Sequence, residues 1–296
     1  MGELAALLTG VCWSFTSIFF NNASRAVGSV RVNRLRLLVA SGILLSVHWI
    51  FFGSPIPLRA TSEQWMWLGL SGILGFVLSD GFLFQAFVHI GARLTTLIMA
   101  LDPVVSAIIA WMWLGEQLTT IEIGGIILTV LGVAWVVLER NNGNGSHSKK
   151  DKILGVLCAM GAVLGQSFGF VLSKMGLANG FSPLSGVIIR ILVAAVVMWG
   201  LAIITGKVKY TLEGFNNKTA RNNILAGSIV GPSLGVWLSM VAVQIIPVGI
   251  ASTLMATRPL LLVPLSKWFY DEKISARAFI GTVIALAGVT MIFIFG

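Results

Sequence analysis

Two charged residues stand directly before prolines in apolar stretches of this sequence. Asp102 precedes Pro103 in "TLIMALDPVVSAIIAWMWLGEQLT", and Arg258 precedes Pro259 in "TLMATRPLLLVPLSKWFYDEKIS". A charge at membrane depth is costly unless it is paired or hydrated, and proline removes a backbone N–H and disturbs the helix beside it. We expect an Asp102–Arg258 ion pair, or two separate charged poles, at a polar cavity near the membrane midplane. Such residues recognise a substrate carboxylate or amine, or form a structural pair that sets helix packing.

Five further side chains lie near the middle of apolar stretches and are candidates for substrate binding. Asp80, in "GFVLSDGFLFQAF", is a lone acid that either binds a substrate ammonium or a proton, or holds neighbouring helices together by hydrogen bonds. Gln85 and Gln166 are amides suited equally to helix packing and to substrate contact. Trp13 and Trp237 are placed to line a cavity for an apolar or aromatic substrate.

Other polar residues favour structural roles. Arg36 and Arg190 are near the starts of their apolar stretches, so we expect them to extend to the membrane interface. Glu116 and Glu272 follow the two proline-containing stretches and are expected to cap the turns there. Glycines that recur every fourth residue are expected to let helix backbones approach closely. These are Gly161, Gly165 and Gly169 in one stretch, and Gly227, Gly231 and Gly235 in another.

The elements that carry these residues are membrane spans. Of the 296 residues 56% are hydrophobic and 10% charged, and the mean hydropathy is +0.92. Since a span needs about 20 apolar residues, the sequence predicts an all-α polytopic membrane protein with ten transmembrane helices. They lie near 4–21, 34–52, 66–88, 94–114, 121–138, 153–173, 184–205, 223–246, 250–269 and 277–295. This leaves no room for a soluble catalytic or nucleic-acid-binding domain, and the first 21 residues are expected to remain as a helix.

Composition also limits cofactors and topology. Cys12 and Cys158 lie in predicted spans and form neither a disulfide nor a metal pair in this interpretation, and no cofactor is expected.

The formal charge of +9 comes from loops, where Lys and Arg mark the cytoplasmic side. On the face shared by the termini are Arg59 and Lys174. On the other face are Arg25, Arg31, Arg93, Arg140, Lys149, Lys150, Lys152, Lys207, Lys209, Lys218, Arg221, Lys267, Lys273 and Arg277. This asymmetry favours external termini.

The chain contains an internal repeat. A shift of 156 residues places Met99, Ala100, Pro103, Glu116, Gly125, Gly132 and Val133 on Met255, Ala256, Pro259, Glu272, Gly281, Gly288 and Val289, and a shift of 154 places "RLLVA" on "RILVA". We therefore predict two five-helix repeats, residues 1–138 and 153–296, joined by a polar linker at 139–152. Because five is odd, the second copy enters the membrane from the opposite side, which gives the inverted repeat typical of carriers.

The sequence resembles the drug/metabolite transporter superfamily, in particular its ten-helix EamA-type members. The resemblance covers the full chain and rests on the duplication, on the two proline-containing helices, and on the Gly-rich fifth helices "GGIILTVLGV" and "IGTVIALAGV". It implies a secondary carrier, often an exporter, that moves metabolites such as amino acids, sugars or drugs by alternating access. It also implies cytoplasmic termini. The small four-helix exporters of the superfamily use a Glu in the first helix for proton coupling, whereas "LLTGVCWSFTS" has no acid.

Together these observations favour a multi-pass carrier in the cell (inner or plasma) membrane, with the lipid bilayer and a small molecule as its partners. In the first hypothesis the substrate is an amino acid or similar zwitterion, with Arg258 on its carboxylate and Asp80 or Asp102 on its amine. The alternative is an uncharged or apolar substrate in the same fold. A remote alternative is a serine hydrolase at Ser167 in "GQSFG". The protein is expected to act as a monomer, with proton coupling or exchange possible.

Overall fold

The computed structural model describes residues 1–139, 149–257 and 276–295, and all the regular secondary structure in those ranges is helical. In chain order the helices are α1 (Gly2–Val27), α2 (Ser29–Phe52), α3 (Ser62–Gly72), the π-helical segment η1 (Ile73–Ser79), α4 (Asp80–Met99), α5 (Asp102–Leu114), α6 (Thr120–Glu139), α7 (Lys149–Gly176), η2 (Ala178–Gly180), α8 (Pro183–Ile204), α9 (Val208–Leu212), η3 (Glu213–Asn216), α10 (Lys218–Ser228), the π-helical segment η4 (Ile229–Gly235), α11 (Val236–Ile245), α12 (Val248–Met255) and α14 (Ala276–Phe295).

Six of the described helical stretches are long and apolar enough to cross a membrane. They are Gly2–Val27, Ser29–Phe52, Ser62–Ile90, Lys152–Gly176, Pro183–Ile204 and Lys218–Ile245. Shorter apolar helices occupy Asp102–Leu114, Thr120–Trp135 and Phe279–Ile292. The chain is therefore an all-helical polytopic membrane protein, as the sequence predicts.

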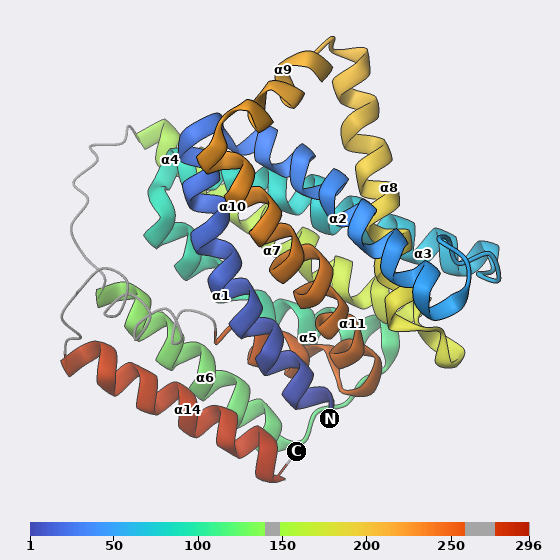
Figure 1. Ribbon diagram of the computed structural model, residues 1–296. Helices are drawn as coiled ribbons and strands as arrows, with labels where there is room; N and C mark the ends of the chain where they lie inside the picture. Colours follow the sequence, from blue (N-terminus) through green and yellow to red (C-terminus); the bar gives the residue numbers. More distant parts are fainter. Residues whose placement is uncertain (140–148, 258–275, 296) are drawn as a thin grey trace.

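The helices of the two halves of the chain pack against each other. The first helix, α1, lies along α10, η4 and α11, while α7 lies along α3, η1 and α4 (Figure 1). Glycines make both contacts close, because a Cβ on Gly165 would lie 3.0 Å from the Cβ of Ser79, and one on Gly231 would lie 2.6 Å from Cγ2 of Thr16. This confirms the prediction that the glycine rails serve helix packing.

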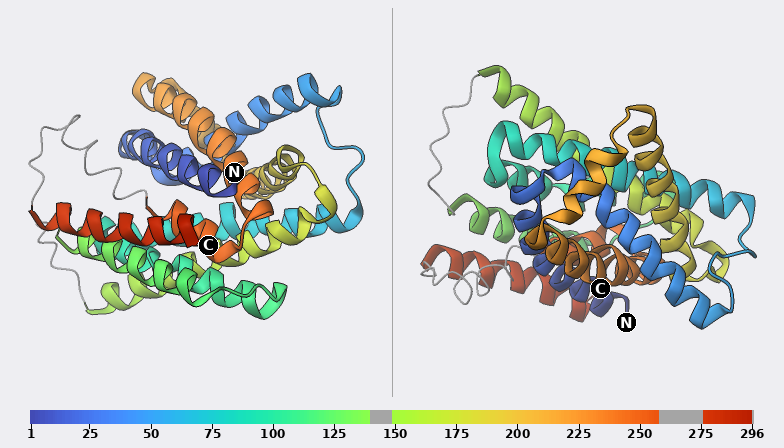
Figure 2. Two further views of the ribbon diagram at one scale, coloured as in Figure 1. Left: turned by 90° about the horizontal axis from the view of Figure 1, so that it is seen from below. Right: turned by 45° about the horizontal axis from the view of Figure 1, so that its top comes forward.

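A second pair of helices forms one edge of the bundle. Figures 1 and 2 show α6 and α14 side by side there. Glycine again sets the contact: a Cβ on Gly288 would lie 2.6 Å from the backbone nitrogen of Thr129 and 2.7 Å from the carbonyl oxygen of Gly125. The outer faces of these helices are exposed and apolar, with residues such as Ile127, Leu131 and Leu286, as expected for surfaces that meet lipid.

Helical irregularities recur at the repeat distance. The π-helical segments begin at Ile73 and Ile229, 229 − 73 = 156 residues apart, and α4 and α12 end at Met99 and Met255, which gives the same offset. Pro232 lies inside η4, where its missing N–H removes one α-helical hydrogen bond.

One predicted loop is wrong. The sequence places a loop at 89–93, between the third and fourth spans, whereas α4 continues as helix through these residues to Met99. The chain instead leaves the helix at Ala100 and Leu101 and starts again at Asp102. The cause lies in Asp102 and Pro103, which favour a new helix start over a continuous fourth helix.

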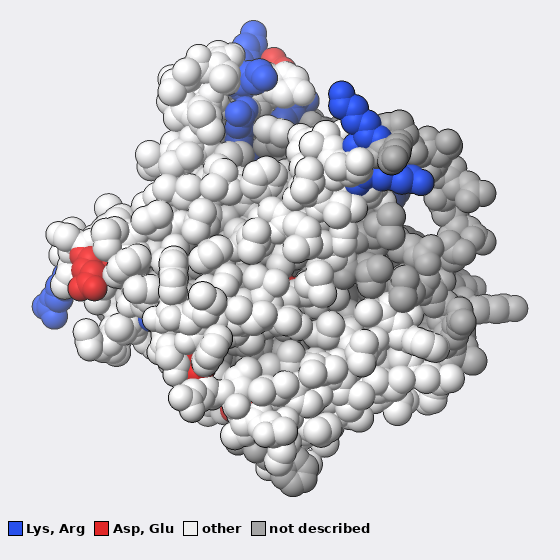
Figure 3. Space-filling view, turned by 180° about the vertical axis from the view of Figure 1, so that it is seen from behind, with Lys and Arg blue, Asp and Glu red and all other residues white. Residues whose placement is uncertain are grey.

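Charge is concentrated at the ends of the bundle. Figure 3 shows a broad middle region almost free of charged atoms, with Lys and Arg gathered near α9 and near the start of α7. Lys150, Lys152, Lys207 and Lys209 are exposed there. Arg59, in the loop between α2 and α3, is also exposed. The uncharged middle is the part that a bilayer would cover.

Candidate functional site

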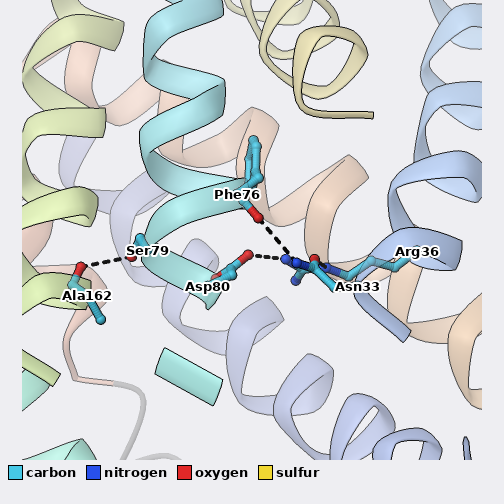
Figure 4. Close-up of polar contacts among 6 residues, drawn as sticks. All are labelled: Asn33, Arg36, Phe76, Ser79, Asp80 and Ala162. Atoms are coloured by element: carbon cyan, nitrogen blue, oxygen red, sulfur yellow. Dashed lines mark hydrogen bonds and ion pairs between the residues drawn. The ribbon is translucent and has the colours of Figure 1, made fainter. Parts of the chain in front are cut away.

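A buried ion pair joins α2 to the end of the π-helical segment η1. Arg36 pairs with Asp80, and the two side chains are only 11% and 17% exposed. Asp80 is the first residue of α4, directly after η1, and Figure 4 shows both charged groups pointing toward each other between the helices. The lone acid singled out in the sequence is therefore one member of an ion pair.

Hydrogen bonds fix this pair on both sides. Asn33 Oδ1 accepts from Arg36 Nε at 2.8 Å, and Asn33 Nδ2 donates to the carbonyl oxygen of Phe76 at 3.3 Å (Figure 4). On the other side of η1, Ser79 Oγ donates to the carbonyl oxygen of Ala162 in α7 at 2.8 Å. The π-helical segment is thereby tied to helices from both halves of the chain. Such segments are frequent at functional sites in helical proteins.

A second arginine meets the same segment from α8. Arg190 is 3% exposed, and its guanidinium lies over the ring of Phe76, 5.0 Å from the ring centre. Its Nη1 donates to the thioether sulfur of Met240 at 3.1 Å, and its Nε has no hydrogen-bond partner in the described part of the chain. The carboxylate of Asp80 acts on it through space.

The expectation that Arg36 and Arg190 reach the membrane interface is wrong. Arg190 is buried and the Arg36 side chain is only 11% exposed. Each lies seven residues after the first residue of its helix, Pro183 in α8 and Ser29 in α2. The early start of α2 places Arg36 about two turns inside the helix, where Asp80 holds it.

Asp102 serves a helix start. It is 8% exposed and begins α5, with Pro103 in the first turn of that helix. Ser167 Oγ donates to Asp102 Oδ1 at 2.6 Å, and Ser106 Oγ donates to the same oxygen at 3.3 Å. A carboxylate at a helix N-terminus is stabilised by the free backbone N–H groups, and proline is favoured in the first turn because its missing N–H is not needed there. This explains why an acid and a proline stand side by side in an apolar stretch.

The same contacts bear on the hydrolase alternative. Ser167 is fully buried and, among the described residues, its hydroxyl bonds only to Asp102. The ring nitrogens of His48 contact the carbonyl of Ser54 and the hydroxyl of Ser185 instead. His48 is therefore not placed to activate Ser167.

The remaining sequence candidates are distributed differently. Trp13 stacks on Phe170, with ring centres 6.4 Å apart, and Trp13 and Trp237 both pack, partly buried, against the main core cluster, which includes Phe76 and Met240. Gln166 is partly buried, and Gln85 is exposed on α4. Arg258 lies outside the described residues, as does its proposed pairing with Asp102.

A polar contact closes one end of the bundle. Glu116 Oε2 accepts from the backbone N–H of Val248 at 2.8 Å, which caps the start of α12, and Glu116 also pairs with Lys174. The ammonium of Lys174 donates to the carbonyl oxygen of Ile246 at 2.8 Å. The prediction that Glu116 caps the turn after its own stretch is wrong, because the helix it caps is α12 in the other half of the chain. Glu272 is outside the described residues.

Comparison with known proteins identifies the family. The sequence matches the EamA-like transporter family over residues 1–138 and 153–294. The chain belongs to the EamA-like transporter family, within the drug/metabolite transporter superfamily. It is 30% identical over 112 residues to the "Uncharacterized transporter YvbV" of Bacillus subtilis (strain 168); the match covers 38% of this chain and 35% of that protein. One solved crystal structure matches with a TM-score of 0.79 at 15% identity, over 98% of this chain and 96% of that one, which shows the fold.

The family and the relative named as a transporter indicate that this chain moves a small molecule across a membrane. They point to a transporter rather than an enzyme. The buried residues that could recognise such a molecule include two that we interpreted as interfacial from the sequence, Arg36 and Arg190. The signal that could have found them is the repeat itself, since "RLLVA" and "RILVA" place an arginine at equivalent positions in both halves. Asn33 had no such signal. No group of three His, Cys, Asp or Glu in the described ranges is placed to hold a metal ion.

Proposed function

We propose that this chain is a secondary carrier that moves an amino acid or similar zwitterion by alternating access. In this proposal ten spans form two inverted five-helix repeats, residues 1–138 and 153–296, with the substrate site between them. The 156-residue offset between η1 and η4, and between the ends of α4 and α12, supports the repeats. So does the packing of α1 on α10 and α11, which mirrors the packing of α7 on α3 and α4.

The observation that carries the proposal is the presence of buried charges of both signs at helix interruptions. Asp80 follows a π-helical segment, Asp102 starts a helix after a break, and Arg36 and Arg190 meet the first of these positions. Charged groups at membrane depth mark substrate or ion pathways. Carriers place their substrate sites at interrupted helices near the midplane. In the proposal Arg258 belongs to the same set of charges. A zwitterion carries one positive and one negative group, and a site with charges of both signs can bind both.

The aromatic residues of the core support a second substrate class. The stack of Trp13 on Phe170 and the partly buried Trp237 lie against the same core cluster as Phe76. If the Arg36–Asp80 pair stays closed during transport, these rings favour an uncharged or apolar molecule such as a sugar, nucleoside or drug. Export, a location in the inner or plasma membrane, coupling to a proton or an exchanged molecule, and action as a monomer complete the proposal.

Counterflow tests both classes. Proteoliposomes are loaded with one unlabelled amino acid, and entry of the same labelled compound is followed for the parent, Arg258→Gln and the control Arg59→Gln, whose arginine is exposed in a loop. We expect at least one amino acid to exchange in the parent and in Arg59→Gln. If the reconstituted protein is of a single size and exchanges a sugar or nucleoside but no amino acid, the zwitterion hypothesis is refuted. The second substrate class then stands. A mass measurement in detergent that showed only dimers would contradict the monomer.

A further inference from the structure

Arg190 is a buried cation that no acid among the described residues contacts directly. Its closest described contacts are the ring of Phe76 and the sulfur of Met240, and its Nε has no partner among the described residues. An arginine keeps its proton in any protein environment. A thioether is only a weak acceptor, and a guanidinium carries five N–H donors. This guanidinium is therefore buried with most of its hydrogen-bonding capacity unmatched by the groups beside it.

The neighbouring charges do not balance. Arg36 and Arg190 contribute two positive charges, while Asp80 contributes one negative charge and is held by Arg36. Asp80 also attracts Arg190 electrostatically. These three residues therefore leave one net positive charge buried in the membrane region. Burial of an uncompensated charge is costly, and one singly charged carboxylate group would pair with this guanidinium, whereas a doubly charged phosphate would overshoot the balance.

Comparison of the two halves shows where the acid is missing. Asp80 follows η1, and the residue that follows η4 at the 156-residue offset is Val236. Val236 is 4% exposed and lies one helical turn before Met240, the residue that contacts Arg190. The first half thus supplies an acid for its arginine, and the second half supplies a valine in the equivalent place.

The backbone next to Arg190 is shaped to admit the guanidinium. Gly75 lies in η1, and a Cβ added there would meet one neighbouring atom within 4 Å, Nη2 of Arg190, at 3.2 Å. Gly72 lies directly against the backbone of Arg190. Absence of side chains at both positions lets α8 and its arginine reach the π-helical segment.

We infer that Arg190 binds the carboxylate of the transported molecule, and that the substrate is a monocarboxylate with an apolar body. The planar guanidinium matches a carboxylate with two parallel hydrogen bonds, and Phe76, Phe170 and Met240 supply the apolar surroundings. This inference rests on the proposed carrier function, and it assigns the carboxylate to Arg190 in place of Arg258.

Binding to purified protein in detergent tests the site without transport. The probes share one body and differ in charge: L-leucine, L-leucinamide, which lacks the carboxylate, and 4-methylpentanoate, which lacks the amine. Thermal stabilisation is measured at constant chloride and ionic strength. We expect leucine and 4-methylpentanoate to stabilise the parent and Arg258→Gln. In Arg190→Gln their affinity falls by roughly ten- to a hundredfold, as expected for loss of a hydrogen bond to a charged group.

Two further variants keep Arg190 in place, so the test does not depend on whether Arg190→Gln folds. Val236→Asp supplies the missing acid, and Gly75→Ala presses on the guanidinium. Both are expected to weaken binding of 4-methylpentanoate, whereas Gly81→Ala, where an added Cβ meets nothing within 4 Å, is the matched control and leaves binding unchanged.

The outcomes separate the two proposals. If Arg190→Gln and Val236→Asp bind 4-methylpentanoate as the parent does, or if no carboxylate stabilises the folded parent, the anion site is refuted. If amino acids still exchange in that case, the carrier function stands without it. If the carboxylates bind through Arg190 but no amino acid exchanges in proteoliposomes, the anion site stands and the proposed amino-acid transport fails.

Discussion

The two buried arginines should respond in opposite ways to removal of their charge. In Arg36→Met the carboxylate of Asp80 loses its ion-pair partner and Asn33 Oδ1 loses its donor. In Arg190→Met no acid loses a direct partner, and the new thioether joins Phe76 and Met240. The structure therefore predicts a large loss of stability at position 36 and little or none at position 190.

The size of the difference follows from the burial of the ion pair. Breaking a buried pair costs about 3–5 kcal/mol, and we take the lower end, about 3 kcal/mol, because the two side chains are 11% and 17% exposed. The orphaned acceptor of Asn33 adds about 1 kcal/mol. Removal of the uncompensated charge at Arg190 relieves a buried-charge cost, so Arg190→Met should leave stability unchanged or raise it. The variants should thus differ by at least about 4 kcal/mol, roughly a thousandfold in the unfolding equilibrium.

Equilibrium unfolding in mixed micelles measures this difference. Purified variants in dodecylmaltoside are titrated with sodium dodecyl sulfate and followed by tryptophan fluorescence. The double variant Arg36→Met with Asp80→Leu removes both members of the pair and should recover most of the loss, since an apolar pair of similar volume replaces a buried ion pair at little cost. An Arg190→Met variant as unstable as Arg36→Met would refute the reasoning, because it would show that Arg190 is held by a structural partner.

Three further predictions concern the helix contacts. Gly231→Val should lower the unfolding free energy by about 1–3 kcal/mol in the same titration, because its side chain has no room against α1. Ser167→Ala should cost about 1–3 kcal/mol by removing the 2.6 Å hydrogen bond to Asp102, with no hydrolytic activity in the parent to lose; measurable esterase activity that depended on this serine would contradict the structure. Glu116→Gln should increase hydrogen exchange at the amide of Val248, which it caps; unchanged exchange would show that the cap does not hold α12.

Hydropathy predicted the six long apolar helices of the described residues well, because a span must be continuously apolar. It failed where polar residues are satisfied by distant partners. Arg31 and Arg34 delayed the predicted start of the second span to residue 34, yet the helix starts at Ser29. Arg31 stacks on the ring of Tyr210, and Arg34 donates to Thr211 from Nη1. Both partners follow more than 170 residues later, so a local window does not register them.

The sequence indicated which types of residue form the candidate site, but not which residues pair with each other. Intramembrane acids could be found from the sequence, but the partner of Asp80 is set by how η1 packs against α2. From the sequence we expected Asp102 to pair with Arg258 or to form a separate charged pole. The contacts described for Asp102 are to Ser106 and Ser167. The two serines carried no signal because hydroxyls in apolar helices most often bond to their own backbone.

The interleaved packing of the two halves bears on how the chain is assembled during synthesis. The helix α1 packs mainly on α10, η4 and α11, which are made more than 190 residues later. In contrast, the helices α3 and α4, against which α7 packs, are made before α7. Contacts so distant in sequence form slowly, and α1 must wait with its partner face against lipid or the insertion machinery. The nascent protein therefore passes through a long stage at which α1 is inserted without its main partner helices, when it is most open to degradation or to association with another chain.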